Sequence, residues 1–166
     1  MKAETYKKIF SSDLGSLLEI RVFNTSVDDW QVLLDDLVAK YVSVYSEDGI
    51  EAPLPSAVVL LQRDKEKALS LEVLLCGFTM NCHFFDDSQI QLNISPEDVD
   101  SIEKAEAVFD FMKRLSTLLN KQVTLTPEYG GASLEEVSNL AVCVADPTAD
   151  SVHSRLDNVG DKPADN

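Results

Sequence analysis

Apolar and polar residues alternate in several short segments of the chain, a pattern typical of β-strands with one covered face. The alternating segments are residues 17–23, 69–75, 78–84 and 89–94. The turn-forming residues Asp86, Asp87 and Ser88 separate the last two of these segments. We therefore expect those two segments to form a β-hairpin, and we expect Gly77 to mark a turn just before it.

Two longer segments repeat apolar residues at the spacing of an amphipathic helix. The first covers residues 27–41, with Ser26 as its N-cap and Asp29 at the third helical position. Its apolar stripe, which we expect to pack on the sheet, consists of Val27, Trp30, Leu33, Leu34, Leu37, Val38 and Tyr41. The second helix is expected to run from Ile102 to Leu119, with Asn120 as a left-handed cap.

The remaining segments are less regular. Residues 46–56 are rich in turn formers and are expected to be a loop, whereas the apolar run 57–62 predicts a short strand. Residues 122–126 alternate and predict a further strand. Residues 133–136 fit the start of a short helix, and residues 141–145 would extend that helix or form an edge strand.

These elements predict an α+β fold with a mainly antiparallel sheet, two amphipathic helices packed on one face, and a short C-terminal helix or strand. Residues 1–145 would form a single domain, and residues 146–166 would form an acidic, flexible C-terminal tail. The uncovered face of the sheet would be polar, and nearly uncharged around the hairpin. It would carry Asn81, His83 and Gln91 among its polar residues.

Acidic residues strongly outnumber basic ones. The 166-residue chain has 29 Asp and Glu against 14 Lys and Arg, for a net charge of −15. Residues 146–166 hold five Asp against one Arg and one Lys, so −12 of this charge belongs to residues 1–145. Such a surface repels phosphate backbones and anionic lipid headgroups. We therefore expect neither nucleic acid nor a membrane among the partners.

The cysteines and the N-terminal residues favour a cytoplasmic protein. No apolar run of signal-peptide length follows the charged residues near Met1. The spacing of Cys76, Cys82 and Cys143 fits no zinc or redox motif, so we expect three reduced thiols.

No assembled reactive centre can be read from the residues, and we expect no catalytic residue, metal or cofactor. Cys82 and His83 are neighbours on a strand, so they would face opposite ways, with Cys82 in the core. Asp86 or Asp87 could form a minimal acid–base pair with His83, although the spacing does not require it. The acidic clusters lack the alternating pattern of a calcium loop. Gly130-Gly131 lacks the lysine and hydroxyl residue of a phosphate-binding loop and is interpreted as a turn.

In size and charge the chain resembles immunity proteins of bacterial toxin systems and acidic chaperones of secreted effectors. The resemblance implies a bacterial, non-enzymatic, acidic protein-binding domain that inhibits or chaperones a basic protein. Effector chaperones of this size typically open with a helix. This chain is expected to open with the strand at residues 17–23, which counts mildly against the chaperone role.

Two surfaces are candidates for contact with a basic partner. One comprises the outward-facing acidic residues of the helices, namely Asp28, Asp35, Glu103, Glu106 and Asp110. The other is the polar sheet face around Asn81, His83 and Gln91. The alternative function is a small ligand-binding domain or enzyme that uses the sheet face around His83. A homodimer formed through that face or through an edge strand is a third possibility.

Overall fold

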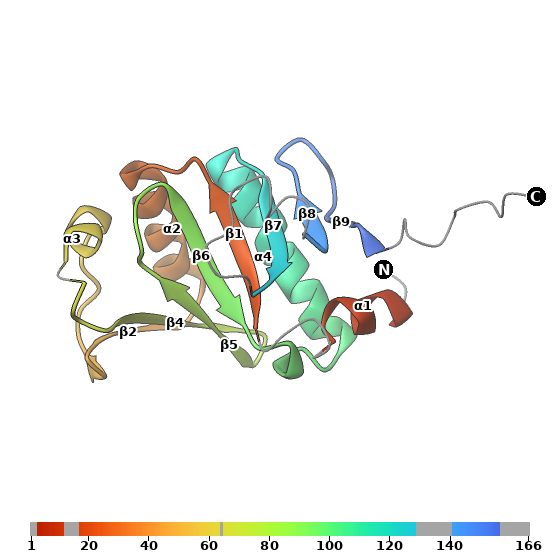
Figure 1. Cartoon of the computed structure of the whole chain (residues 1–166), viewed down its shortest axis with the longest axis horizontal. Coiled ribbons are helices and arrows are strands. Elements are labelled where there is room, and N and C mark those ends of the chain that lie inside the picture. Colours follow the sequence, from red (N-terminus) through yellow and green to blue (C-terminus); the bar gives the residue numbers. More distant parts are fainter. Residues whose placement is uncertain (1–2, 12–16, 64, 129–140, 157–166) are drawn as a thin grey trace, which may run out of the picture.

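A computed structural model of the chain shows one sheet of antiparallel strands with helices packed against it (Figure 1). The structure describes residues 3–11, 17–63, 65–128 and 141–156. In chain order, the helices and strands are α1 (Ala3–Ile9), β1 (Leu18–Phe23), α2 (Val27–Lys40), β2 (Ser43–Glu47), β3 (Ile50–Glu51), α3 (Ala57–Gln62), β4 (Leu69–Leu75), β5 (Phe78–His83), β6 (Gln89–Ile94), the 3-10 helix η2 (Pro96–Asp98), α4 (Ile102–Leu119), β7 (Val123–Pro127), β8 (Cys143–Ala145) and β9 (His153–Ser154).

The nine described strands follow the order β3-β2-β4-β5-β6-β1-β7-β8-β9, and each neighbouring pair is antiparallel. The predicted α+β class with a mainly antiparallel sheet is therefore confirmed. The predicted hairpin is also present, with His83 of β5 opposite Gln91 of β6. Cys76 and Gly77 form the turn between β4 and β5, both with positive φ. None of the helices in the described ranges is long and apolar enough to cross a membrane.

Helices α2 and α4 pack on the same face of the sheet, as predicted (Figure 1). Ser26 caps α2 through a reciprocal capping box with Asp29. Asn120 ends α4 in the left-handed region at φ 52°. Between the helices, the Arg114 guanidinium donates two hydrogen bonds to the Asp36 carboxylate, at 2.9 and 2.5 Å. The start of α2 and both ends of α4 therefore lie where the sequence predicts them, whereas α2 ends one residue earlier, at Lys40.

Trp30 belongs to the core, as its position in the apolar stripe predicts. Its side chain is fully buried, and its ring lies 5.4 Å from the ring of Phe84 between centroids. Its indole Nε1–H donates to the main-chain oxygen of Asp86 at 3.2 Å. Trp30 thus links α2 to the loop that joins β5 to β6.

Two local predictions between α2 and β4 are wrong. The apolar run 57–62 forms the helix α3 rather than a strand, with Ala57 and Leu60 buried and the intervening valines exposed. Within the predicted loop 46–56, β2 and β3 form a hairpin around Asp48 and Gly49, whose φ angles are 50° and 78°. Both conformations suit an Asp-Gly hairpin turn.

Both ends of the described chain also differ from expectation. Helix α1 precedes β1, so the expected opening strand is wrong. Phe10, directly after α1, packs on Phe109 of α4 with ring centroids 5.8 Å apart. Within residues 141–145, Cys143–Ala145 form β8, the strand alternative of the prediction, but β8 pairs with both β7 and β9 and is therefore not an edge strand. Residues 146–156, assigned by the sequence to a flexible tail, instead form a turn and β9. The segments 129–140 and 157–166 lie outside the described residues, and the predicted turn at Gly130-Gly131 and helix at 133–136 fall in the first of them.

The two faces of the sheet are covered differently along its width. In β4 and β5, buried residues alternate with exposed or half-buried ones, as predicted for a sheet with one open face. In β1 and β7, residues of both faces are buried: Glu19, Arg21 and Thr126 are only 4%, 5% and 1% exposed. The expectation that the sheet is covered on one face is therefore wrong at its centre.

Candidate functional site

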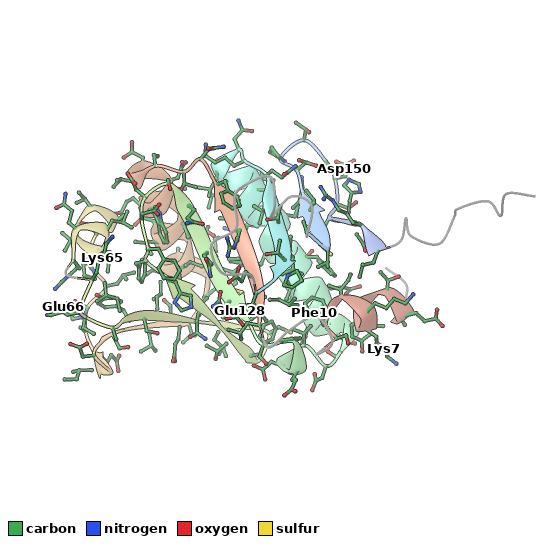
Figure 2. All side chains as sticks on the ribbon, in the orientation of Figure 1. Lys7, Phe10, Lys65, Glu66, Glu128 and Asp150 are labelled. Atoms are coloured by element: carbon green, nitrogen blue, oxygen red, sulfur yellow. The ribbon has the colours of Figure 1, made fainter. Side chains whose placement is uncertain are left out.

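An acidic cavity of about 420 Å³ lies between α4 and the segment that contains β9. Three carboxylate side chains line it, from Glu106 and Asp110 of α4 and from Asp150. Phe109 and Val152 contribute apolar surface to the same cavity. Figure 2 labels Asp150 on the loop between β8 and β9. We call this site the acidic cavity.

Lys113 fixes the segment that forms one wall of the acidic cavity. Its ammonium donates hydrogen bonds to the main-chain oxygens of Asp146, at 3.0 Å, and Pro147, at 3.5 Å, and also to that of Ala149. An ammonium has three N–H donors, so these carbonyls engage all of them. Lys113 keeps its positive charge, so the cavity lining holds three carboxylates against one ammonium.

Replacing Lys113 by methionine is expected to loosen β9 without unfolding the rest of the protein. Hydrogen bonds from a charged donor contribute about 1–3 kcal/mol in sum at a half-buried site such as this one. The amide of Arg155, which donates to the Val142 oxygen at 2.9 Å, should exchange with deuterium about tenfold faster or more. Hydrogen-exchange mass spectrometry measures this rate. The control is K104M, which removes the same charge from the other end of α4. Equal exchange of the Arg155 amide in both variants would contradict the conclusion that Lys113 holds this segment in place.

Only some of the predicted acidic contacts come together. Glu106 and Asp110 share the acidic cavity, whereas Glu103 is exposed on the same helix outside it. Asp28 and Asp35 are exposed on α2. Asp35 accepts a hydrogen bond from Gln31 at 2.9 Å and lines a separate groove of about 600 Å³ beside residues 54–56.

Asp150 is the cavity residue that the sequence analysis missed. The five Asp residues after Ala145 made this region look like a solvated tail. Val152 and Leu156, which pack against the core, were the available signal that the chain returns to the fold here.

On the polar face of the sheet, a hydrogen-bonded network connects β1, β6 and β5. Arg21 Nε donates to Glu19 Oε2 at 2.7 Å, and Gln91 Nε2 donates to Glu19 Oε1 at 2.9 Å. Gln91 Nε2 also donates to Asn93 Oδ1 at 3.2 Å, and Asn93 Nδ2 lies 3.0 Å from His83 Nε2. We call these five residues the polar network.

The polar network determines the protonation of His83. Because Asn93 Oδ1 accepts from Gln91, its amide nitrogen faces His83 as a donor, and His83 Nε2 must accept. A neutral ring with its proton on Nδ1 satisfies this arrangement. Burial lowers the pKa of His83, which favours the same neutral form. The ring also stacks on Phe85, with centroids 5.6 Å apart and planes 12° apart.

The three residues predicted as partner contacts on the sheet face differ in how accessible they are. Asn81 and His83 are half-buried, but Gln91 is only 8% exposed, and its amide is occupied by the polar network. Gln91 therefore supports His83 through Asn93 instead of offering a contact surface.

Cys82, His83 and Asp86, the candidates for nucleophile and acid–base residues, do not form a connected catalytic group. Cys82 is buried on the opposite face from His83, and burial raises the pKa of its thiol to about 12. Hydrogen bonds from Ser88, chiefly from its hydroxyl, lower the pKa of the Asp86 carboxyl. The carboxylate of Asp86 is thus engaged by Ser88, whereas His83 is engaged by Asn93.

Comparisons with protein-family models, curated proteins and solved structures gave no match to this chain. Functional inference therefore starts from the cavities and the polar network. Within the described ranges, no group of three or more His, Cys, Asp or Glu side chains is arranged to hold a metal ion.

Proposed function

We propose that this protein is a non-enzymatic binding domain that takes a basic side chain of a protein partner into the acidic cavity. The shared position of Glu106, Asp110 and Asp150 along the lining of one cavity carries this proposal. A lysine or arginine side chain has an apolar stem and a charged head. Its stem would lie against Phe109 and Val152, and its head would reach the carboxylates.

The charge of the whole chain supports the same partner class. A net charge of −15 produces a field that attracts a basic protein and accelerates encounter. The carboxylates of Asp28, Asp35 and Glu103 are exposed on the helices and add to this field. They would act mainly on the association rate, whereas the acidic cavity would hold the bound side chain.

Inhibition or chaperoning of the partner is the role that this binding would serve, as in immunity proteins of bacterial toxin systems and acidic effector chaperones. A bacterial, cytoplasmic setting belongs to the same proposal, as does the exclusion of nucleic acid by the negative field.

Neutralising the acidic cavity tests the proposal. The double variant Glu106→Gln/Asp110→Asn should weaken binding of a short arginine-rich peptide by about tenfold or more, which corresponds to about 1.4 kcal/mol. Isothermal titration calorimetry measures this affinity. Its change between two salt concentrations shows how much of the binding free energy is electrostatic.

The matched control is Glu51→Gln/Glu72→Gln, which removes the same charge from exposed positions on β3 and β4. It should weaken binding much less, because it alters only the long-range field. Equal losses in the two double variants would show attraction by net charge alone and would overturn the cavity as the binding site.

The second candidate function is a small-ligand site around His83. A further cavity beside His83 favours it, since the polar network holds the imidazole in one protonation state at the edge of that cavity.

A further inference from the structure

The cavity beside His83 gathers cationic side chains in an otherwise acidic protein. Its volume is about 420 Å³, and it lies between α3 and the ends of β4 and β5. Arg63, Lys65 and Lys67 line it together with His83. Figure 2 shows Lys65 close to α3, at the opposite end of the molecule from Asp150 of the acidic cavity. The two cavities are therefore separate sites with opposite charge. We call this one the basic cavity.

Arg63 and Lys67 each pair with a carboxylate that lies outside the lining of the basic cavity. Glu47 lies 3.1 Å from Arg63 and 3.6 Å from Lys67, so one carboxylate serves two basic side chains. Asp86 is the acidic residue that lines the basic cavity itself. Among the described residues that line the basic cavity, three cations thus accompany one carboxylate, while Glu47 and Glu66 lie outside that lining.

Arg63 also has unused hydrogen-bonding capacity. Its Nε is buried and makes no hydrogen bond, while its terminal nitrogen contacts Glu47. A buried N–H without an acceptor is unfavourable, and an anionic oxygen is its strongest acceptor. Guanidinium groups bind phosphate and carboxylate oxygens with particular preference.

His83 adds a neutral donor to these cations. Its Nε2 accepts from Asn93, so its Nδ1–H remains the donor of the ring. Phe84 and Phe85 also line the basic cavity, together with leucines of α3. The walls therefore combine anion-binding groups with aromatic and aliphatic surface, and the volume is in the range of small-molecule sites.

We infer that the basic cavity binds a small phosphate monoester with an aromatic body. The phosphate oxygens would accept from Arg63 and lie near the ammonium groups of Lys65 and Lys67. The aromatic body would pack against Phe84 and Phe85. This site is independent of the proposed binding of a basic protein partner, because it uses other residues at the other end of the molecule.

Phenyl phosphate, inorganic phosphate and phenol are the probes that separate these contributions. Titration of the full-length protein followed by NMR chemical shifts should show saturable binding of phenyl phosphate, with perturbations at His83 and Phe85. Inorganic phosphate should bind at least about tenfold more weakly, and phenol should show no saturation. Absence of saturable binding at millimolar phenyl phosphate would overturn the inference.

A charge-matched pair of variants tests the location. Lys65 and Lys67 are exposed, so Lys65→Gln/Lys67→Gln should fold normally and should weaken phenyl phosphate binding by about tenfold. The control Lys7→Gln/Lys8→Gln removes two exposed lysines from α1, where Figure 2 shows Lys7 far from Lys65. It should bind like the wild type. Equal weakening in both double variants would show attraction by net charge and would overturn the site.

Loss of affinity for the arginine-rich peptide, by contrast, concerns only the acidic cavity.

Discussion

Replacing Arg21 by methionine is expected to lower the free energy of unfolding by about 3–5 kcal/mol. The side chains of Arg21 and Glu19 form an ion pair and are only 6% and 5% exposed. The substitution leaves the Glu19 carboxylate buried, with Gln91 Nε2 as its remaining donor in the polar network. Urea unfolding followed by far-ultraviolet circular dichroism measures the loss.

The double variant Arg21→Met/Glu19→Gln separates the charge effect from the packing effect. A glutamine at position 19 keeps a carbonyl oxygen for Gln91 and carries no charge. We expect it to recover at least about half of the stability lost in R21M, because no buried charge remains unpaired. A cost below about 1 kcal/mol for R21M alone would show that the pair is solvated in the folded protein.

Replacing Trp30 by alanine should also cost about 3–5 kcal/mol. The indole is fully buried, packs on Phe84 and donates to the main chain at Asp86. The variant loses the core contacts of α2 and its link to the β5–β6 loop. Because Trp30 is the only tryptophan, circular dichroism rather than fluorescence must follow unfolding.

Trp30→Phe is the control for the hydrogen bond. A phenylalanine fills most of the same volume but cannot donate to Asp86, so a loss of about 1–2 kcal/mol is expected. Similar losses in the alanine and phenylalanine variants would mean that the hydrogen bond, and not ring packing, dominates at this position.

The two long helices could be predicted from sequence, because their capping residues and their apolar stripes indicate the same helical segments. Helix α4 begins at Ile102 and ends at Leu119, as its stripe and Asn120 predict. The run 57–62 could not be assigned by this route, since a six-residue apolar run has no clear period. Its tertiary surroundings decide the outcome, because α3 buries Ala57 and Leu60 and places Ala57 N–H on the Gln31 side chain of α2 at 2.8 Å.

The candidate sites were predicted less completely than the fold. Outward-facing carboxylates such as Glu106 and Asp110 follow from helical periodicity. The part played by Asp150 depends on a hydrogen-bonded clamp at Lys113 with no local sequence signature. The charge of residues 63–67 is visible in the sequence, but their convergence on His83 depends on how α3 and the hairpin pack together.

Burial of the central polar residues could not be predicted from alternation. In β1, Glu19 and Arg21 occupy the positions of an open face by period two, yet both are buried. The alternation of apolar and polar residues indicates on which face of the sheet a side chain lies. It does not indicate which other part of the chain covers that face. The ion pair and Gln91 make the burial tolerable, because they supply the partners that water would otherwise provide.

The described sheet ends on each side in a strand of only two residues, β3 at one margin and β9 at the other. A strand this short offers a second molecule very few unpaired main-chain groups. In β3, Glu51 also adds a negative charge to that margin of the sheet. Growth of the sheet by lateral addition of further copies is therefore disfavoured at both margins. We therefore expect the described sheet to resist edge-to-edge pairing with further copies of the chain.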